Sequence, residues 1–208
     1  MKTKKIIAAL LAATLAATAA VSASAATLTE QNPDGSTEVT ARIEGAAPGD
    51  VSYVITIPDK VDFGTLMQPE TNESDSYKYL GFEVVATELN NLENRQAVSV
   101  FIKDSTSDDG QFYLTQKDTA NPFTIAYDVY ENTVDDNNIV DYTPMNQSGD
   151  TGEYGYHLCT FTSGAQGAVQ NVTLALNQKN LFGLNLDDIA GDYSGNMVFH
   201  SALTTIGG

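Results

Sequence analysis

The sequence contains no tryptophan, a single cysteine and two histidines. With one cysteine, Cys159, no intramolecular disulfide can form, so a hydrophobic core must hold the fold together. Cys159 lies between apolar neighbours in "YHLCTF", and we expect it to be a small buried hydrophobe rather than a nucleophile. The lack of tryptophan argues against a lectin that stacks sugars on indole rings.

Basic residues are also scarce. Ten lysines and arginines stand against 27 acidic residues, for a formal net charge of −17. Three of the ten are Lys2, Lys4 and Lys5, so from residue 26 onward seven basic residues face all 27 acids. This balance excludes nucleic acid and anionic lipid as expected partners. It is typical of a well-solvated surface outside the cell.

Residues 1–25 have the pattern of a signal peptide. A lysine-rich start is followed by the apolar run from Ile6 to Val21, and small residues stand at Ala23 and Ala25. We predict cleavage after Ala25 and an exported protein, secreted or extracellular, of a Gram-positive bacterium. A permanent membrane anchor is the alternative, but the end of the apolar run matches a cleavage site, which favours export. No second long apolar run follows, so we expect no membrane span after cleavage.

Beyond residue 35, apolar and polar residues alternate in segment after segment. In residues 79–86, for example, Leu80, Phe82, Val84 and Ala86 fall on one face. Such alternation predicts strands with one buried face. The predicted strands are residues 37–44, 51–57, 79–86, 97–103, 122–130, 169–176 and 194–203.

Runs rich in Asn, Asp, Gly, Pro and Ser separate these segments, as in "NQSGDTGEYG". We therefore predict an all-β fold, an antiparallel β-sandwich of the jelly-roll or immunoglobulin-like kind with roughly 9–11 strands. Little helix is expected after the signal peptide, apart from single turns at 88–94 and 184–191. The predicted domains are a flexible tail at 26–35 and one sandwich domain at 36–208.

The stretch "VSYVITIPDKVDFGTL" (51–66) interrupts a strand pattern with Pro58. Proline cannot donate to a strand ladder, so Pro58 is expected at a strand end. We predict a bend at Asp59 and Lys60, followed by a second strand in which Val61 and Phe63 return to the core.

This stretch resembles the opening of the WxL domain of Gram-positive cell-surface proteins, and "AGDYSGNMVFHSAL" (190–203) resembles the closing strand of that family. Similar Gly-x-Tyr endings occur in other exported Firmicutes adhesins and pilin-like subunits. The resemblance spans residues 51–203 and implies a β-sandwich at the cell surface. The Trp-x-Leu motifs that name the family are absent, and Phe112 to Leu114 and Phe199 stand near where they would fall.

No residue pattern predicts a catalytic, cofactor-binding or metal site. The acidic loop "DSTSDDG" (104–110) lacks the glycine and glutamate of an EF-hand, although acidic turns of this kind could hold a structural Ca²⁺. A zinc site is incomplete, because His157 and Cys159 are expected on one strand face with no further ligand. Neither histidine lies in a nucleophile turn, and with so many acids a carboxylate pair carries no weight. We expect no enzymatic activity.

The ten tyrosines suggest a binding surface, because tyrosine combines stacking area with a polar hydroxyl. Tyr77 and Tyr79 share one strand face; several others, Tyr130, Tyr142, Tyr154 and Tyr156, lie in or beside loops. The alternative is that several of them belong to the core.

The sequence therefore predicts an exported, non-enzymatic surface β-sandwich that acts in adhesion or cell-wall association. Since the chain carries no LPxTG-type sorting motif, we expect attachment to be non-covalent. Expected partners are a cell-wall polymer, a host glycan or a surface protein. Self-association is a further alternative, in which residues 26–44 add as a donor strand to build a pilus-like fibre. A secreted hydrolase is the last alternative.

Overall fold

The computed structural model describes residues 51–72, 74–148 and 152–207. All of them belong to the second of two compact units into which the chain divides, Met1–Val39 and Thr40–Gly208. The predicted signal peptide, the tail at 26–35 and the strand at 37–44 lie outside the described residues and stay predictions.

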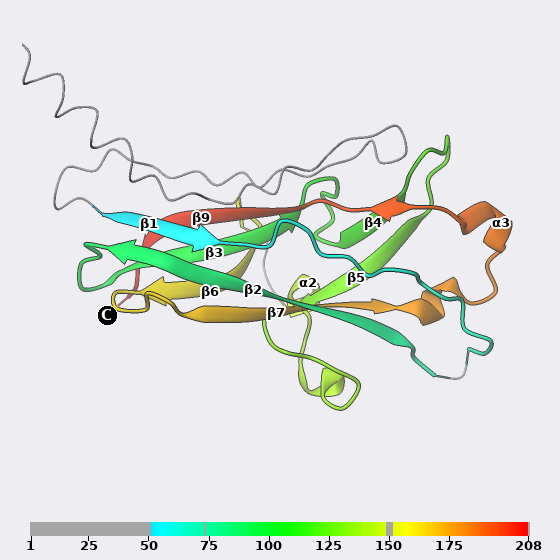
Figure 1. Cartoon of the computed structure of the whole chain (residues 1–208), viewed down its shortest axis with the longest axis horizontal. Coiled ribbons are helices and arrows are strands. Elements are labelled where there is room, and N and C mark those ends of the chain that lie inside the picture. The colour runs from blue at the N-terminus through cyan, green and yellow to red at the C-terminus, as the bar shows by residue number, and fades with distance from the viewer. Residues whose placement is uncertain (1–50, 73, 149–151, 208) are drawn as a thin grey trace, which may run out of the picture. The chain divides into compact units, whose positions relative to one another are not determined.

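The described residues form two antiparallel sheets (Figure 1). A six-stranded sheet has the order β1-β2-β7-β5-β4-β8, and a three-stranded sheet has the order β6-β3-β9. This confirms the predicted all-β antiparallel sandwich. The strands are β1 (Ser52–Thr56), β2 (Tyr77–Asn90), β3 (Gln96–Asp104), β4 (Phe112–Gln116), β5 (Thr124–Tyr130), β6 (Tyr156–Thr162), β7 (Val169–Asn177), β8 (Tyr193–Ser194) and β9 (Met197–Thr205).

The core is built from the inward residues of both sheets. Val84 on β2 and Leu174 on β7 belong to the same buried cluster as Val100 and Ile102 on β3. Phe112 on β4 is the largest fully buried side chain. Aromatic pairs of this kind prefer edge-to-face or offset arrangements, and the rings of Phe112 and Tyr127 lie 5.7 Å apart at 37°. The predicted face of Leu80, Phe82, Val84 and Ala86 is confirmed as the core face of β2.

The connecting segment, residues 57–72 and 74–76, differs from the prediction. Antiparallel β1 ends at Thr56 and no strand follows before Tyr77, so the second strand predicted after Pro58 is wrong. Gly64 has a φ of 62° and donates its N–H to Asp62 Oδ1 at 2.8 Å, a tight turn that takes the backbone away from strand geometry. Phe63 nevertheless enters the core, with 9% of its surface exposed, and Val61 packs against the same cluster.

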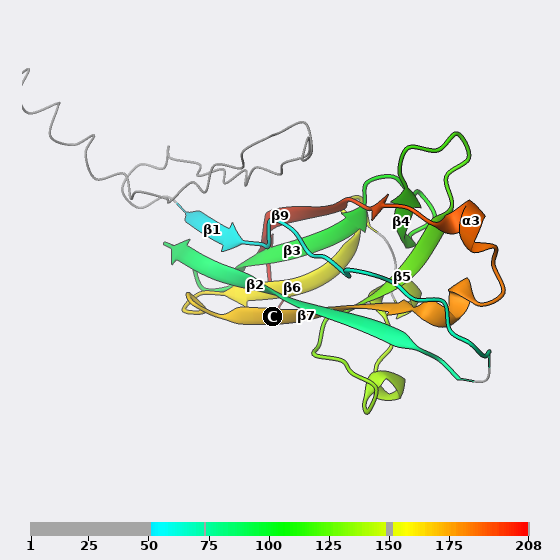
Figure 2. The ribbon, with the colours of Figure 1, turned by 45° about the vertical axis from the view of Figure 1, so that its right-hand side comes forward.

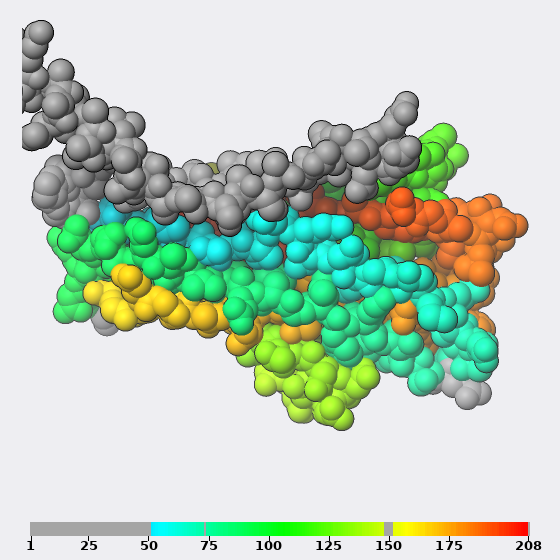
Figure 3. Space-filling view, in the orientation of Figure 1, coloured from blue at the N-terminus to red at the C-terminus, as the bar shows by residue number. Residues whose placement is uncertain are grey.

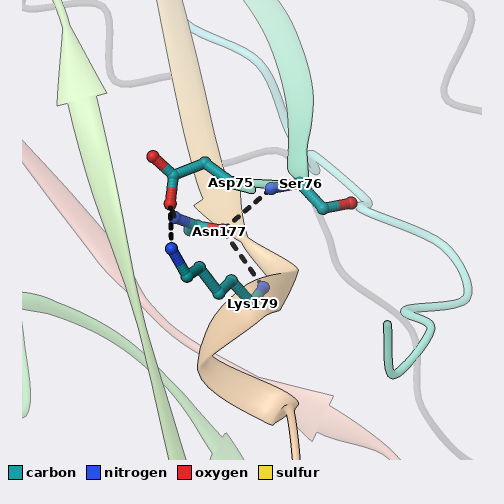
Figure 4. A network of polar contacts seen from close by, with 4 residues as sticks. All are labelled: Asp75, Ser76, Asn177 and Lys179. Atoms are coloured by element: carbon teal, nitrogen blue, oxygen red, sulfur yellow. Dashed lines mark hydrogen bonds and ion pairs between the residues drawn. The ribbon is translucent and has the colours of Figure 1, made fainter. Parts of the chain in front are cut away.

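Side chains hold the end of this segment against the last residue of β7 and the turn that follows it (Figure 4). Asn177 Oδ1 accepts hydrogen bonds from the backbone N–H of Ser76 at 3.2 Å and of Lys179 at 3.1 Å. Asn177 Nδ2 donates to Asp75 Oδ1 at 3.0 Å, and Lys179 Nζ forms an ion pair with the same oxygen at 3.3 Å. The connecting segment thus reaches β2 through a side-chain anchor.

Helical structure in the described residues is confined to short turns. The helical turn predicted at 88–94 is wrong, because β2 continues to Asn90 and the chain then reverses through Asn91 and Arg95, which have φ of 56° and 81°. The turn predicted at 184–191 is confirmed as α3 (Leu186–Ile189). Three further turns were not predicted from the sequence: η1 (Ile139–Asp141), α2 (Met145–Ser148) and η2 (Gln178–Leu181). None of the described helices has the length and apolar character needed to span a bilayer.

Candidate binding surface

The structure separates the tyrosines of the sequence prediction into structural and exposed ones. Tyr156 is 6% exposed and belongs to the main core, and Tyr130 is 4% exposed in a second small cluster. Among the described residues, two tyrosine side chains are exposed: Tyr142, at 39%, and Tyr154, at 38%. The candidates for ligand contact are therefore these two.

Tyr77 and Tyr79 form a stacked pair on β2, with ring centroids 5.8 Å apart, and both pack against the cluster of Tyr130. Tyr79 Oη donates to Asp136 Oδ1 at 2.9 Å, which ties the loop between β5 and β6 to the sheet. Burial, followed by the charge of Asp128, raises the pKa of Tyr130 to about 12. This loop stands out from the sandwich in the space-filling view (Figure 3), and the tyrosines beneath it have a structural role.

Tyr154 lies in a different setting, in the turn before β6. This turn leads into the three-stranded sheet, in which β3 runs between β6 and β9 (Figure 2). Its ring stacks on His200 with centroids 3.8 Å apart and planes 10° from parallel. Phe101 lies beside both, 5.9 Å from Tyr154 and 6.4 Å from His200, and His157 meets the other side of Phe101 at 5.6 Å. We call Phe101, Tyr154, His157 and His200 the aromatic patch.

Strand register brings the patch together. Phe101 on β3 is opposite His157 on β6 and His200 on β9, so both histidines of the chain flank the same ring. Val100 and Ile102, its neighbours on β3, are buried in the core, which places Phe101 on the outer face of the sheet. His157 is exposed, and Phe101 and His200 are half-buried.

A bulge in β6 separates His157 from Cys159. Val100 pairs with Cys159 and Phe101 with His157, so the register shifts across Leu158. As a result Cys159 lies in the core, where burial and then the charge of Glu131 raise the pKa of its thiol to about 12. The expectation that His157 and Cys159 share a strand face is wrong, since a bulge changes which face the following residues take. The prediction that Cys159 is a buried hydrophobe is confirmed.

The turn before β6 carries Tyr154 to its position. Gly152 and Gly155 exchange two backbone hydrogen bonds, at 3.2 and 3.1 Å. Gly155 has a φ of 97°, and a Cβ added there would lie 2.2 Å from the carbonyl oxygen of Ile102. Glycine is required for this close approach of the turn to β3.

The chemistry of the patch is stacking and hydrogen bonding. His157 Nε2 and Thr160 Oγ1 share a hydrogen bond of 2.8 Å, and Lys103 leaves the same face of β3 two residues after Phe101. Within residues 51–72, 74–148 and 152–207, no three His, Cys, Asp or Glu side chains are placed to hold a metal ion. An aromatic surface with donors at its rim suits a ligand with ring faces and polar edges.

The acidic loop after β3 uses its carboxylates internally. Asp104 accepts from the N–H and hydroxyl of Thr106, both at 2.7 Å, and from the N–H of Tyr113 at 2.9 Å. Asp109 accepts from the Ser107 hydroxyl, from the Gln111 N–H and from the Tyr113 hydroxyl, and these bonds, that of Ser107 first, hold its pKa below the usual value. The loop geometry is explained by these turns.

Sequence reasoning did not find the patch. Phe101 occupies an outward position of a strand, where alternation predicts a polar residue, and that departure was the available signal. The two histidines were weighed only as metal ligands or catalytic bases, and their meeting across β3 depends on pairings between strands distant in sequence.

Comparison with known proteins gives little. No protein family matches the chain, and no curated protein matches it either. Among solved structures, one similar chain comes from work described as "Chaperone-tip adhesin complex is vital for synergistic activation of CFA/I fimbriae biogenesis", with 16% sequence identity and a TM-score of 0.40. The match covers 74% of this chain and 42% of that one, so this chain spans less than half its length. So distant a likeness carries no argument about function.

Proposed function

We propose that this protein is an exported, non-enzymatic β-sandwich of the bacterial surface that binds its ligand through the aromatic patch, in adhesion or in non-covalent attachment to the cell wall. The observation that carries the proposal is the stack of Tyr154 on His200 beside Phe101, on an outward sheet face. Exposed aromatic clusters of this kind are typical of recognition surfaces.

Binding fits the described residues better than catalysis does. The one thiol is buried and has a raised pKa, so it is a poor nucleophile. The hydroxyl beside His157 belongs to Thr160, which follows it by three residues on β6, and the third side chain bonded to this pair, Ser99, contacts the Thr160 hydroxyl and not the imidazole. Among the hydrogen bonds of residues 51–72, 74–148 and 152–207, none orients the His157 ring as the third member of a triad would.

Export supports a ligand outside the cell. The signal peptide pattern of residues 1–25 and the resemblance to WxL domains both favour a surface setting, in which wall polymers and host glycans are the abundant partners. Sugar rings offer apolar C–H faces that stack on aromatic side chains, while their hydroxyls reach the rim. A polysaccharide is therefore the ligand class we favour.

The test is sedimentation of residues 26–208 with and without purified cell walls, comparing wild type with Tyr154→Ala and Tyr142→Ala. The two tyrosines are almost equally exposed, at 38% and 39%, but Tyr154 alone belongs to the patch. We expect wild type and Tyr142→Ala to pellet with walls, and Tyr154→Ala to stay in the supernatant. Equal pelleting of both variants would remove the patch from wall binding.

A second candidate function is that of a fibre subunit that assembles by strand addition. In the described sheets β9 stands at one end of the order β6-β3-β9, with β3 as its paired neighbour over its whole length. An edge strand of nine residues is a template for another strand. The predicted donor, residues 26–44, lies outside the described residues.

A further inference from the structure

We infer that the aromatic patch binds an uncharged oligosaccharide, one sugar of which stacks on Tyr154 while another donates a hydroxyl hydrogen bond to Nδ1 of His157. This inference rests on the proposed function and assigns the ligand class of its site. It follows from a chain of hydrogen bonds across the three-stranded sheet, from the charges around the patch and from the stacking face of Tyr154.

A chain of four polar side chains crosses the outer face of the three-stranded sheet. His157 Nε2 lies 2.8 Å from Thr160 Oγ1, which in turn lies 3.0 Å from Ser99 Oγ. Ser99 Oγ lies 2.9 Å from Thr204 Oγ1, and Thr204 Oγ1 donates to the backbone carbonyl oxygen of Ala97 at 3.3 Å. The chain thus begins at an exposed imidazole on β6 and ends at a carbonyl group on β3.

The carbonyl group at its end sets the direction of every hydrogen bond in this chain. A carbonyl oxygen only accepts and a hydroxyl has one proton, so Thr204 donates to Ala97 and must accept from Ser99. By the same count Ser99 accepts from Thr160. Thr160 then has no second proton for His157, and it is Nε2 of the imidazole that donates to Thr160.

This direction gives the patch a fixed acceptor. A neutral imidazole carries one N–H, so donation from Nε2 leaves Nδ1 as an acceptor. His157 is exposed, and among the hydrogen bonds of residues 51–72, 74–148 and 152–207 its Nδ1 has no partner. The imidazole lies 5.6 Å from the ring of Phe101. A ligand that lies on these rings therefore gains a hydrogen bond at His157 only if it supplies a donor.

The need for a donor favours a sugar over a polymer of phosphates. Sugar hydroxyls donate, whereas ionised phosphate oxygens accept only. A phosphate polymer would bring acceptors towards an acceptor and would have no ring face to place on Tyr154. A glycan supplies both the donor and the ring.

The charges around the patch favour an uncharged glycan over an acidic one. Beside the patch, the charged residues in the described part of the chain are Lys103 on β3 and Glu153 in the turn before β6, and their signs are opposite. The patch thus has no excess of cations to attract an anion, on a chain whose formal net charge is −17. Repulsion by such a chain opposes the approach of a polyanion, while a neutral glycan is not repelled.

The positions of Tyr154 and His157 indicate the smallest ligand. His200 covers one face of the Tyr154 ring, at 3.8 Å and 10° from parallel, so a stacking sugar must use the opposite face. His200 and His157 belong to β9 and β6, on either side of β3, and these two strands are about 10 Å apart. A single pyranose ring is shorter than this distance, so we expect a disaccharide to be the shortest ligand.

Binding is measured by isothermal titration calorimetry of residues 26–208 at pH 8, in 50 mM and 0.5 M NaCl. The neutral ligands are galactomannan, pullulan and laminarin, which differ in sugar and linkage, and the anionic ligands are polygalacturonate and polyphosphate. We expect at least one neutral polysaccharide to bind, with an affinity that changes less than about twofold between the two salt concentrations, since no ion pair is formed. Both anionic polymers should bind at least about tenfold more weakly.

Two tyrosine variants test the stacking contact. Tyr154→Ala should weaken binding of the neutral polysaccharide about tenfold or more, because it removes the platform. Tyr142→Ala, at an almost equally exposed tyrosine outside the patch, should stay within about twofold of wild type. Circular dichroism checks that each variant is folded.

Two variants of His157 test the acceptor. His157→Phe keeps a ring beside Phe101 but removes the acceptor, and we expect it to weaken binding about threefold to tenfold, as for loss of one neutral hydrogen bond. His157→Gln should stay within about twofold of wild type, because an amide can donate to Thr160 and still accept from the ligand. Equal affinities of the two variants would overturn the role of His157 as an acceptor.

The tautomer can be observed directly in the free protein. A long-range ¹H–¹⁵N correlation spectrum shows which imidazole nitrogen carries the proton. We expect the Nε2–H tautomer for His157 in wild type and a mixture of tautomers in Thr160→Val, which lacks the hydroxyl that accepts from Nε2. The Nδ1–H tautomer in wild type would overturn the inference, whatever polysaccharide is bound.

The proposed function and this inference fail in different ways. The inference fails if none of the three neutral polysaccharides binds, or if polygalacturonate binds as tightly as the best of them. If walls are still bound in a manner that depends on Tyr154, the surface role then stands without it. If a neutral polysaccharide binds as expected but Tyr154→Ala still pellets with walls, the patch has the inferred ligand chemistry and the wall role fails.

Discussion

Gly155 determines where Tyr154 lies. Its φ of 97° and the position of its missing Cβ, 2.2 Å from the Ile102 carbonyl oxygen, exclude any side chain there without movement of the turn. We predict that Gly155→Ala lowers the free energy of unfolding by about 1–3 kcal/mol, because both strain and a backbone clash oppose it. It should also reduce cell-wall binding although no aromatic residue is changed. Urea unfolding and wall sedimentation measure the two effects.

Gly164 provides the matched control for this prediction. It also has a positive φ, 84°, but a Cβ added there meets nothing within 4 Å. Gly164→Ala should therefore cost only the conformational strain, about 1 kcal/mol, and leave wall binding unchanged. If both variants lost the same free energy of unfolding, the close approach of the turn to β3 would not contribute to the cost of Gly155→Ala.

Tyr127 makes stability depend on alkaline pH. It is 5% exposed in the core, and burial, followed by the charge of Asp104, raises its pKa well above the usual value. A raised pKa in the folded state stabilises the fold below the unfolded pKa of about 10, and this contribution is lost as pH rises further. We predict that the urea midpoint of wild type falls between pH 9 and 11, and that it falls less for Tyr127→Phe.

Part of that alkaline loss should remain in Tyr127→Phe, because burial also raises the pKa of the Cys159 thiol, to about 12. A variant that lost stability as steeply as wild type would show that Tyr127 ionises without unfolding the protein.

The connecting segment between β1 and β2 contains no helix or strand in its described residues, and its buried core residue is Phe63. The ring of Phe63 meets that of Tyr127 at 5.8 Å and 60°. We predict that Phe63→Ala lowers the free energy of unfolding by about 3 kcal/mol or more, as expected for loss of a buried phenyl ring. Met67→Ala in the same segment, at a residue 70% exposed, should change it by less than about 0.5 kcal/mol. Chemical denaturation of the three proteins decides this.

The strands were predictable because their signal is local. Period-two alternation identified β2, β3, β5, β7 and β9, and it gave the buried face of each correctly where both faces differ, as for Phe82 and Val84. Alternation alone would place Leu203 on β9 on the same face as Met197 and Phe199, yet it is 45% exposed while those two pack against the core. Burial near the end of an edge strand depends on the tertiary contacts of neighbouring elements, which no local pattern contains.

The segment after Pro58 and the patch were not predictable in this way. A Val-x-Phe pattern fits a strand, yet the Asp62 to Gly64 turn prevents pairing while Phe63 still reaches the core. The bulge at Leu158 and the pairing of β3 with both β6 and β9 are tertiary features, so no local pattern could place His157 and His200 on either side of Phe101.

For the whole molecule, net charge and edge strands act against each other in self-association. Like charges repel neighbouring copies, and the strongly acidic composition therefore opposes assembly at low ionic strength. The position of β9 at one end of its sheet, in the described residues, favours it. If the protein is a fibre subunit, raising the salt concentration should shift the balance towards polymer.

The decisive substitution is in the predicted donor strand, whose apolar residues Val39, Ala41 and Ile43 alternate with polar ones. We predict that residues 26–208 polymerise in 0.5 M NaCl, and that Ile43→Asp stays monomeric because a charge on the buried face of an added strand costs several kcal/mol. Thr40→Asp, on the opposite face, should still assemble. Sedimentation velocity separates monomer from polymer. A wild-type protein that remains monomeric at every salt concentration excludes strand addition under these conditions, and polymer formed equally by Ile43→Asp means that some other surface of the molecule joins the copies.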